Sequence, residues 1–296
     1  MKLKIMTSLA ALAVLGLGGC SQGDDVATEA EAEMTEPAAP TAKAATTDDP
    51  YIWMEEVEGE RALDWVRAQN ERSLDRIQAD PLYDELYQNA LDIVNADERI
   101  PYGSVRDGEV YNFWQDETNV RGLWRKTSLE SYASDAPDWE TIVDFDQLAE
   151  DEGKNWVYKG ANCFSAEGND RWACMVSLSN GGKDATEDRE FDLSTKTWVE
   201  NGFFVPEAKS GIAWVDYDTL LIATDWGADG STLTESGYPY VVKRWTRGQP
   251  LEEAVEVYSG EKDDVGVFPM AMELQDGTRL SGVVVADTFF TSRYFL

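Results

Sequence analysis

The chain has 296 residues and a formal net charge of −32, because 57 aspartates and glutamates outnumber 25 lysines and arginines. A surface this negative repels phosphate backbones and anionic headgroups, so we exclude nucleic acid as a partner. The sequence also contains no histidine. This chain alone can therefore build neither a Ser-His-Asp or Cys-His catalytic group nor a histidine-based metal site.

The N-terminus has the pattern of an export signal, and we expect residues 1–19 to be a lipoprotein signal peptide. Two lysines precede an apolar run at 5–17 that is too short to span a bilayer. Two glycines and Cys20 follow and resemble the lipobox of bacterial lipoproteins, which implies cleavage before Cys20 and acylation of its thiol. Ser21 implies sorting to the outer membrane, so we expect a periplasmic protein that meets the membrane through its lipid anchor only. The alternative is an ordinary secretory signal with an incidental cysteine.

Residues 20–48 are predicted to form a flexible acidic tether. They contain alanine, threonine, proline and acids, and too few large apolar side chains to offset the entropy of ordering. Only eight acidic and three basic residues lie before position 50, so the folded part is itself acidic. We interpret this acidity as a solvated surface.

Residues 49–100 are predicted to form an N-terminal helical segment with two helices. From Glu60 onward, apolar side chains recur every three or four positions. Asp80 is expected to cap the second helix, with Pro81 at its first helical position. The apolar face of the first helix contains Leu63, Val66, Leu74 and Ile77, and that of the second contains Leu82, Leu86, Ala90 and Ile93.

From Pro101 onward the sequence predicts short strands separated by turns. Asp107-Gly108 joins a strand at Val105 to one at 110–114. We expect no helix longer than one turn between the strands. Further strands are predicted at 122–128, 141–145, 156–164, 172–178, 189–193, 197–199, 212–215, 219–224, 240–245, 254–258, 269–274 and 280–286.

Turn motifs recur in this region at intervals of about 50 to 60 residues, which is close to one four-stranded propeller blade. Short, evenly spaced antiparallel strands form a sandwich, a barrel or a propeller, and the repetition favours the propeller. The predicted fold class is therefore mainly β, with residues 101–296 as an incomplete β-propeller of about four blades. The repeated motifs are Asp107-Gly108, Glu167-Gly168, Asp216-Tyr217-Asp218 and Asp276-Gly277.

Cys163 and Cys174 are a candidate disulfide pair. In a hairpin centred between Gly168 and Asn169 they lie directly opposite each other, close to bridging distance. An oxidising compartment favours the bond. One extra residue in the turn would instead leave two buried free thiols.

Several segments resemble the prolyl oligopeptidase family of serine peptidases. The segment from Asp49 to Glu55, Asp-Pro-Tyr-Ile-Trp-Met-Glu, is similar to the start of the mature family members. The helix segment 65–70 and the strand segments 172–184, 189–193 and 219–226 follow in the family's order. The resemblance runs from about Asp48 to Leu296.

The resemblance implies a seven-bladed propeller inserted between an N-terminal helical segment and a C-terminal α/β-hydrolase domain. In the family the catalytic serine lies in a Gly-x-Ser-x-Gly-Gly turn of that hydrolase domain. This sequence has no such motif and ends on the apolar, strand-like segment 288–296. Because an unpartnered apolar strand favours aggregation, we expect a fragment with about four of seven blades rather than a naturally short protein.

No catalytic residue, metal site or cofactor site is predicted in this chain. Ser179-Asn180-Gly181-Gly182 resembles half of the family's nucleophile turn, but no histidine can activate the hydroxyl, so we interpret it as a strand-ending turn. Carboxylate neighbours lack the spacing of a calcium loop, and we interpret them as parts of a solvated face. These neighbours are Glu55-Glu56, Glu187-Asp188 and Asp263-Asp264.

The first functional hypothesis is the propeller part of a serine oligopeptidase that hydrolyses short peptides, with cleavage after proline implied by the family resemblance. The propeller would admit short flexible peptides, exclude folded proteins and pair with the missing hydrolase domain, while this chain alone is expected to be inactive. The alternative is a stand-alone, lipid-anchored propeller that binds or scaffolds without catalysis. The gene sequence beyond Leu296 discriminates between the two hypotheses.

Overall fold

The computed structural model describes residues 49–296 except 57–58, 97, 166–171, 228–229 and 275. The predicted signal peptide and tether, including Cys20, lie outside the described residues. The chain divides into two compact units, one ending at Ile77 and one running from Gln78 to Leu296. Among the described residues, no helix combines the length and the apolar character that a membrane crossing requires.

Two helices follow the predicted pattern in the N-terminal part of the chain. A short 3-10 helix, η1 (Ile52–Glu55), precedes α1 (Glu60–Gln78), and the second unit opens with α2 (Tyr83–Val94). The predicted start of the second helix at Pro81 is wrong. The Asp80 carboxylate accepts the Leu82 N–H at 2.9 Å, which closes a turn and delays the helix to Tyr83.

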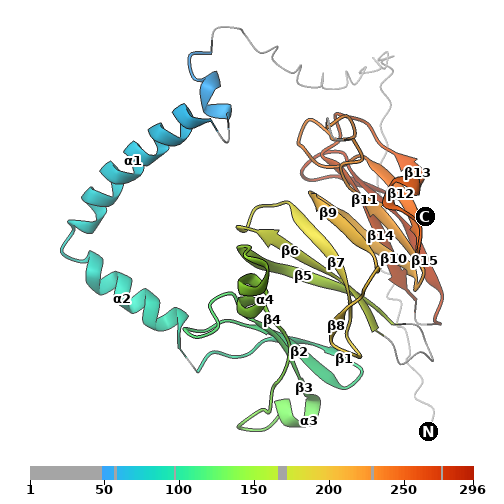
Figure 1. Cartoon of the computed structure of the whole chain (residues 1–296), viewed down its shortest axis with the longest axis horizontal. Helices are drawn as coiled ribbons and strands as arrows, with labels where there is room; N and C mark the ends of the chain where they lie inside the picture. The colour runs from blue at the N-terminus through green and yellow to red at the C-terminus, as the bar shows by residue number, and fades with distance from the viewer. Residues whose placement is uncertain (1–48, 57–58, 97, 166–171, 228–229, 275) are drawn as a thin grey trace, which may run out of the picture. The chain divides into compact units, whose positions relative to one another are not determined.

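The second unit contains four antiparallel sheets among its described residues, which we call sheets A to D in chain order (Figure 1). Sheet A is formed by β1 (Gly103–Arg106), β2 (Glu109–Trp114), β3 (Leu123–Ser128) and β4 (Glu140–Asp144). Sheet B is formed by β5 (Trp156–Ser165), β6 (Trp172–Asn180), β7 (Thr186–Asp192), β8 (Thr197–Trp198) and β9 (Phe204–Ala208). Sheet C is formed by β10 (Gly211–Asp216), β11 (Thr219–Ala223), β12 (Val241–Thr246) and β13 (Val255–Ser259). Sheet D is formed by β14 (Gly266–Glu273), β15 (Arg279–Ala286) and β16 (Ser292–Phe295).

The predicted turn motifs mark the sheet repeat. Asp107-Gly108 joins β1 to β2, Tyr217-Asp218 joins β10 to β11, and Asp276-Gly277 lies between β14 and β15. The fourth motif falls between β5 and β6, outside the described residues. Each of the three described motifs therefore joins the first two strands of one sheet, as expected for propeller blades. The mainly β, propeller-type fold is confirmed, whereas a total of seven blades stays a prediction.

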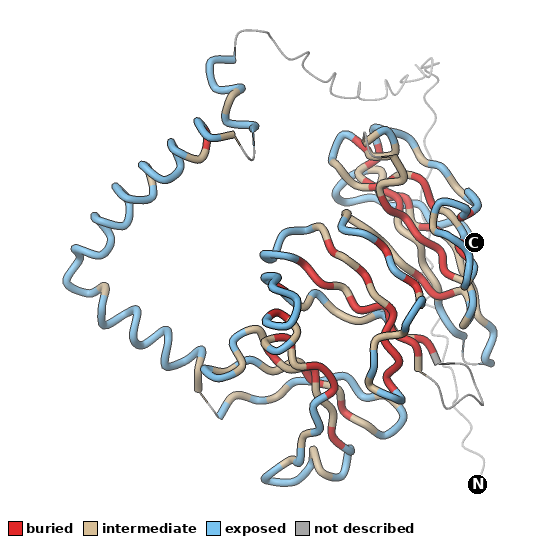
Figure 2. The backbone as a smooth tube through the Cα atoms, viewed as in Figure 1, coloured by how far each residue is buried: buried red, intermediate tan, exposed pale blue. Residues whose placement is uncertain are grey.

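Successive sheets pack face to face, and buried segments run through all of them (Figure 2). Because side chains alternate along a strand, β6 sends Cys174, Val176 and Leu178 toward sheet A and Ala173 and Met175 toward sheet C. A third cluster, which includes Val242 and Val285, joins sheets C and D. The hydrophobic core thus lies between neighbouring sheets, and this packing determines the position of each sheet's ends relative to those of the next sheet.

The expectation that no helix longer than one turn interrupts the strands is wrong. Helix α4 (Phe145–Glu152) links sheet A to sheet B. The Asp144 side chain caps its first turn by accepting the N–H groups of Asp146 and Gln147, both at 3.0 Å. Gly153 ends the helix with a φ of 62°, a left-handed conformation that glycine adopts without strain. The shorter helices α3 (Leu129–Tyr132) and η2 (Leu251–Glu253) are single turns.

Candidate functional site

The candidate site lies at one rim of the stacked sheets, where β1, β5 and β10 begin. Strand registers place Trp114, Leu123 and Asp144 together at this end of sheet A. In sheet B the pairs of Trp156 with Asn180 and of Thr186 with Ala208 lie at the corresponding end. We call this end of the sheets the near rim.

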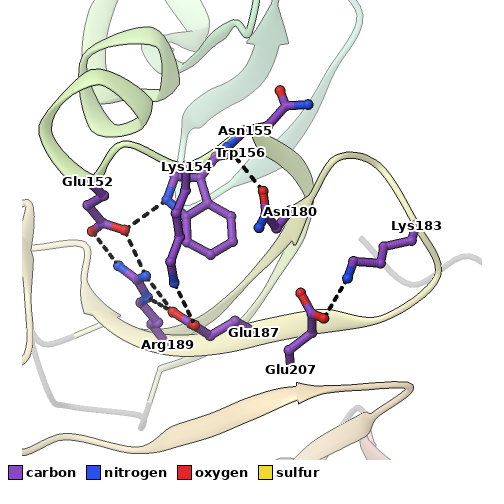
Figure 3. A network of polar contacts seen from close by, with 9 residues as sticks. All are labelled: Glu152, Lys154, Asn155, Trp156, Asn180, Lys183, Glu187, Arg189 and Glu207. Atoms are coloured by element: carbon purple, nitrogen blue, oxygen red, sulfur yellow. Dashed lines mark hydrogen bonds and ion pairs between the residues drawn. The ribbon is translucent and has the colours of Figure 1, made fainter. Parts of the chain in front are cut away.

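Trp156, the first residue of β5, is the centre of a polar network at the near rim (Figure 3). Its buried indole donates from Nε1 to Glu152 Oε2 at 2.8 Å. Arg189 of β7 binds both oxygens of Glu152, with Nη1 2.6 Å from Oε1 and Nη2 2.9 Å from Oε2. This two-pronged ion pair attaches the end of α4 to the middle of sheet B.

Two more charges complete the network around the Trp156 ring. Glu187 forms an ion pair with Arg189 and accepts from Lys154 Nζ at 3.3 Å. Lys154 Nζ and Arg189 Cζ lie 4.5 and 5.1 Å from the centre of the Trp156 ring, so two cations face its π electrons. The hydrogen bond from Arg189 lowers the pKa of Glu152 below its ordinary value. The network therefore balances two carboxylates against two cations.

Arg121, in the loop before β3, connects sheet A to the same rim. Its Nη1 donates to Asn155 Oδ1 and, at 3.1 Å, to the Trp156 carbonyl. The Asp146 carboxylate accepts the Arg121 N–H at 2.9 Å. A cavity of about 500 Å³ opens beside these groups, and burial raises the pKa of Tyr158 in its wall to about 12. Side chains from α4 and from both sheets thus hold the rim in one shape.

This arrangement lacks the pair of a nucleophile and a general base in the part of the chain that the structure describes. Ser179 is buried at the end of β6, and its hydroxyl donates to the Lys183 carbonyl at 2.8 Å. The interpretation of Ser179-Asn180-Gly181-Gly182 as a strand-ending turn is therefore confirmed. No group of three cysteine, aspartate or glutamate side chains within the described ranges could hold a metal ion.

The structure places Cys163 on β5 directly opposite Cys174 on β6, in the predicted register. A disulfide joins the two side chains, and Cys174 is completely buried against sheet A. Cys20, the predicted lipidation site, lies outside the described residues. The structure therefore brings together the two cysteines that were predicted as a pair.

The expectation of solvated carboxylates holds for Glu55 and Glu56, which are exposed, but it is wrong for Asp188 and Asp264. Strand alternation turns Asp188 toward sheet C, where the Ser177 and Thr186 hydroxyls donate to it. Burial raises the pKa of Asp188 above its ordinary value. Asp264 is buried beneath Arg293, whose Nη2 lies 3.6 Å from Asp264 Oδ1.

Sequence reasoning missed Arg121, Glu152 and Arg189, which build the rim. The capping Asp144 and the terminating Gly153 were a readable signal for α4, and hence for a helix end at Glu152. No local signal pairs Arg189 with a residue 37 positions earlier, because the pairing depends on how sheets A and B stack.

The comparisons with a family model and with curated relatives point to the same protein family. Residues 31–280 match the family model described as prolyl oligopeptidase, N-terminal beta-propeller domain. The chain is 43% identical over 227 residues to the uncharacterized peptidase y4nA of Sinorhizobium fredii and 33% identical over 225 residues to the uncharacterized peptidase RP174 of Rickettsia prowazekii. These alignments cover 76% and 73% of this chain but 31% and 30% of the relatives. The chain thus spans about a third of the length of the curated relatives it matches.

Solved structures agree with this assignment. A post-proline cleaving enzyme from Rickettsia typhi superposes with a TM-score of 0.73 at 31% identity, over 81% of this chain and 36% of that chain. Oligopeptidase B from Leishmania major shares the fold, with a TM-score of 0.55 at 18% identity over 83% of this chain and 34% of that chain. The chain therefore belongs to the prolyl oligopeptidase family, to which it contributes the N-terminal β-propeller region.

Proposed function

We propose that this chain is the access-controlling propeller of a serine oligopeptidase that hydrolyses short peptides. One observation carries the proposal. The chain matches the propeller domain of the family, and the described residues of its near rim are held together by ion pairs and hydrogen bonds but include no pair of a nucleophile and a general base. Such a region can select substrates but has no means to attack a peptide bond. An α/β-hydrolase domain would then supply the serine and its partners.

Selection would depend on the rigidity of the sheet ends. The Arg189–Glu152 pair and the Arg121–Asn155 contact hold neighbouring sheets at a fixed distance at the near rim. An opening of fixed width passes an unfolded peptide but rejects a folded domain, because unfolding the domain costs about 5–15 kcal/mol. The specificity for short peptides would thus come from shape rather than from chemistry.

We propose that the protein is a lipoprotein of the periplasm, attached through Cys20 to the outer membrane. The apolar run at 5–17 and the small residues before Cys20 support this location. Metabolic labelling with a fatty acid tests it: the wild-type protein should incorporate the label and Cys20→Ser should not. Equal labelling of both would rule out acylation at Cys20.

The proposed function is tested with the product of the whole gene. A series of unstructured peptides of increasing length, each with one proline, should be cleaved more slowly as the length increases, and the same sequence inside a folded protein should resist cleavage. The variant Arg189→Gln should accept longer peptides, whereas Lys183→Gln, at an exposed ion pair of the same rim, should not. Cleavage at a rate independent of peptide length would refute the proposed control of access. Absence of any turnover would refute the proposal that the whole gene product is a peptidase.

A further inference from the structure

A second cavity, of about 280 Å³, lies between sheets A and B and shares Phe113 and Tyr158 with the cavity at the near rim. Strands β1, β2, β3 and β5 supply its walls. Its volume is just below the range of about 300–1,000 Å³ that is typical of pockets for drug-sized ligands, which suits one or two amino-acid residues. Five aromatic side chains and one arginine line it: Tyr102, Tyr111, Phe113, Trp124, Tyr158 and Arg106.

The strand register explains why these side chains meet. Arg106 lies opposite Glu109, two positions from Tyr111 along the same face of sheet A. Tyr111 and Phe113 point from that face toward sheet B, where the Phe113 ring centre lies 5.0 Å from that of Tyr158. The walls of the cavity therefore combine aromatic rings with polar groups, and Arg106 contributes a cationic side chain to them.

Arg106 lies in the wall of the cavity without a countercharge, although the chain has a net charge of −32. Within the described ranges, no carboxylate lies within ion-pair distance of its guanidinium and no hydrogen bond engages it. The nearest candidate by register, Glu109, instead pairs with Lys126 at 2.9 Å. Arg106 is nevertheless close enough to lower the pKa of Tyr111 and Tyr158, although burial raises the pKa of both. Arg106 thus lines the cavity without an ion-pair partner among the described residues.

We propose that this cavity binds the C-terminal residue of a short peptide, with its free carboxylate on Arg106 and an apolar or proline side chain against Tyr111, Phe113 and Tyr158. A guanidinium forms two parallel hydrogen bonds with a carboxylate, and aromatic faces favour flat apolar groups. The inference rests on the proposed function in taking its ligand from the peptides that such an enzyme would cleave.

Isothermal titration calorimetry of the purified chain tests this site without any catalysis. The probe is the tripeptide acetyl-Gly-Phe-Pro with a free carboxylate, and its C-terminal amide is the matched control. Because a hydrogen bond to a charged group contributes about 1.5–3 kcal/mol, the amide should bind at least about tenfold more weakly. Equal affinities for the two peptides, or no binding of the acid, would overturn the proposal.

A variant locates the site. Arg106→Gln should lose the preference for the acid over the amide, while Arg244→Gln, at an exposed arginine of β12, should keep it. If Arg106→Gln retains the preference, the carboxylate binds elsewhere and the proposal fails. If the variant does not fold, the tryptophan fluorescence of the wild-type protein decides the question: the acid should quench it and the amide should not, and an equal response to both would overturn the proposal. Hydrolysis by the whole gene product is measured separately, so failure of binding here is distinguishable from failure of the proposed function.

Discussion

Arg247 and Glu190 form an ion pair between sheets B and C, with Arg247 Nη1 2.7 Å from Glu190 Oε2 across 57 positions of sequence. The Glu190 side chain is completely buried. The Arg247 guanidinium lies 4.6 Å from the ring centres of both Phe203 and Tyr217, and its Nη2 donates to the Tyr217 carbonyl at 2.6 Å. One arginine therefore compensates a buried carboxylate and joins two sheets.

Arg247→Ala should lower the free energy of unfolding by about 3–5 kcal/mol, because it leaves the buried Glu190 carboxylate without a countercharge and with only the Phe203 N–H as a donor. Urea denaturation followed by circular dichroism measures the change. Arg244→Ala, at an exposed arginine of β12 three residues before Arg247, should stay within about 0.5 kcal/mol of the wild type. The double variant Glu190→Gln with Arg247→Met should lose less than Arg247→Ala does, and a greater loss would contradict this account of the pair.

Asp188 should make the stability depend on pH. Because burial raises its pKa in the folded state, its charged form is disfavoured there, and stability is lost as the pH rises from the unfolded pKa through the folded one. Asp188→Asn removes this titration. The free energy of unfolding of the variant, relative to the wild type, should therefore rise between about pH 4 and pH 7. A difference that is constant or falls over this interval would contradict the assignment.

The disulfide between Cys163 and Cys174 should hold the β5–β6 hairpin together. Labelling of the denatured chain with a thiol reagent should increase on reduction, and equal labelling before and after reduction would exclude the bond. Removing the bond in the double variant Cys163→Ala with Cys174→Ala should cost about 2–4 kcal/mol, because the closed loop no longer restricts the unfolded chain.

Arg189→Gln should lower the free energy of unfolding by about 1–2 kcal/mol, because it removes the partly buried pairs with Glu152 and Glu187. Arg189 holds the pKa of Glu152 below its ordinary value, so this stabilisation is present at neutral pH and lost as the pH falls through the folded pKa. Lys183→Gln breaks the exposed pair with Glu207 and should cost less than about 1 kcal/mol. An equal loss in both variants would refute a special role for Arg189.

Features set by local sequence could be predicted, and features set by packing between sheets could not. The Asp-Gly turns and the pairing of Cys163 with Cys174 follow from hairpin geometry and agree with the structure. Strand β9 was missed because Pro206 and the charged Glu207 obscure its pattern. The pairing of Arg247 with Glu190 depends on the stacking of sheets B and C, which no short sequence window encodes.

The same division explains the candidate sites. Resemblance to a family predicted a propeller region without a catalytic serine, but neither periodicity nor spacing identified Arg121 or Arg106. Both are single arginines among many charged residues in the sequence. Their contacts, of Arg121 with Asn155 and of Arg106 with the cavity, form only where sheets A and B pack together.

The most direct test of this account is the assay of the purified 296-residue chain with a prolyl-peptide substrate. The account predicts no hydrolysis, because a chain without histidine, and without an activated serine among its described residues, can select peptides but cannot cleave them. Turnover by the purified chain that a serine-directed phosphonate blocks would contradict it.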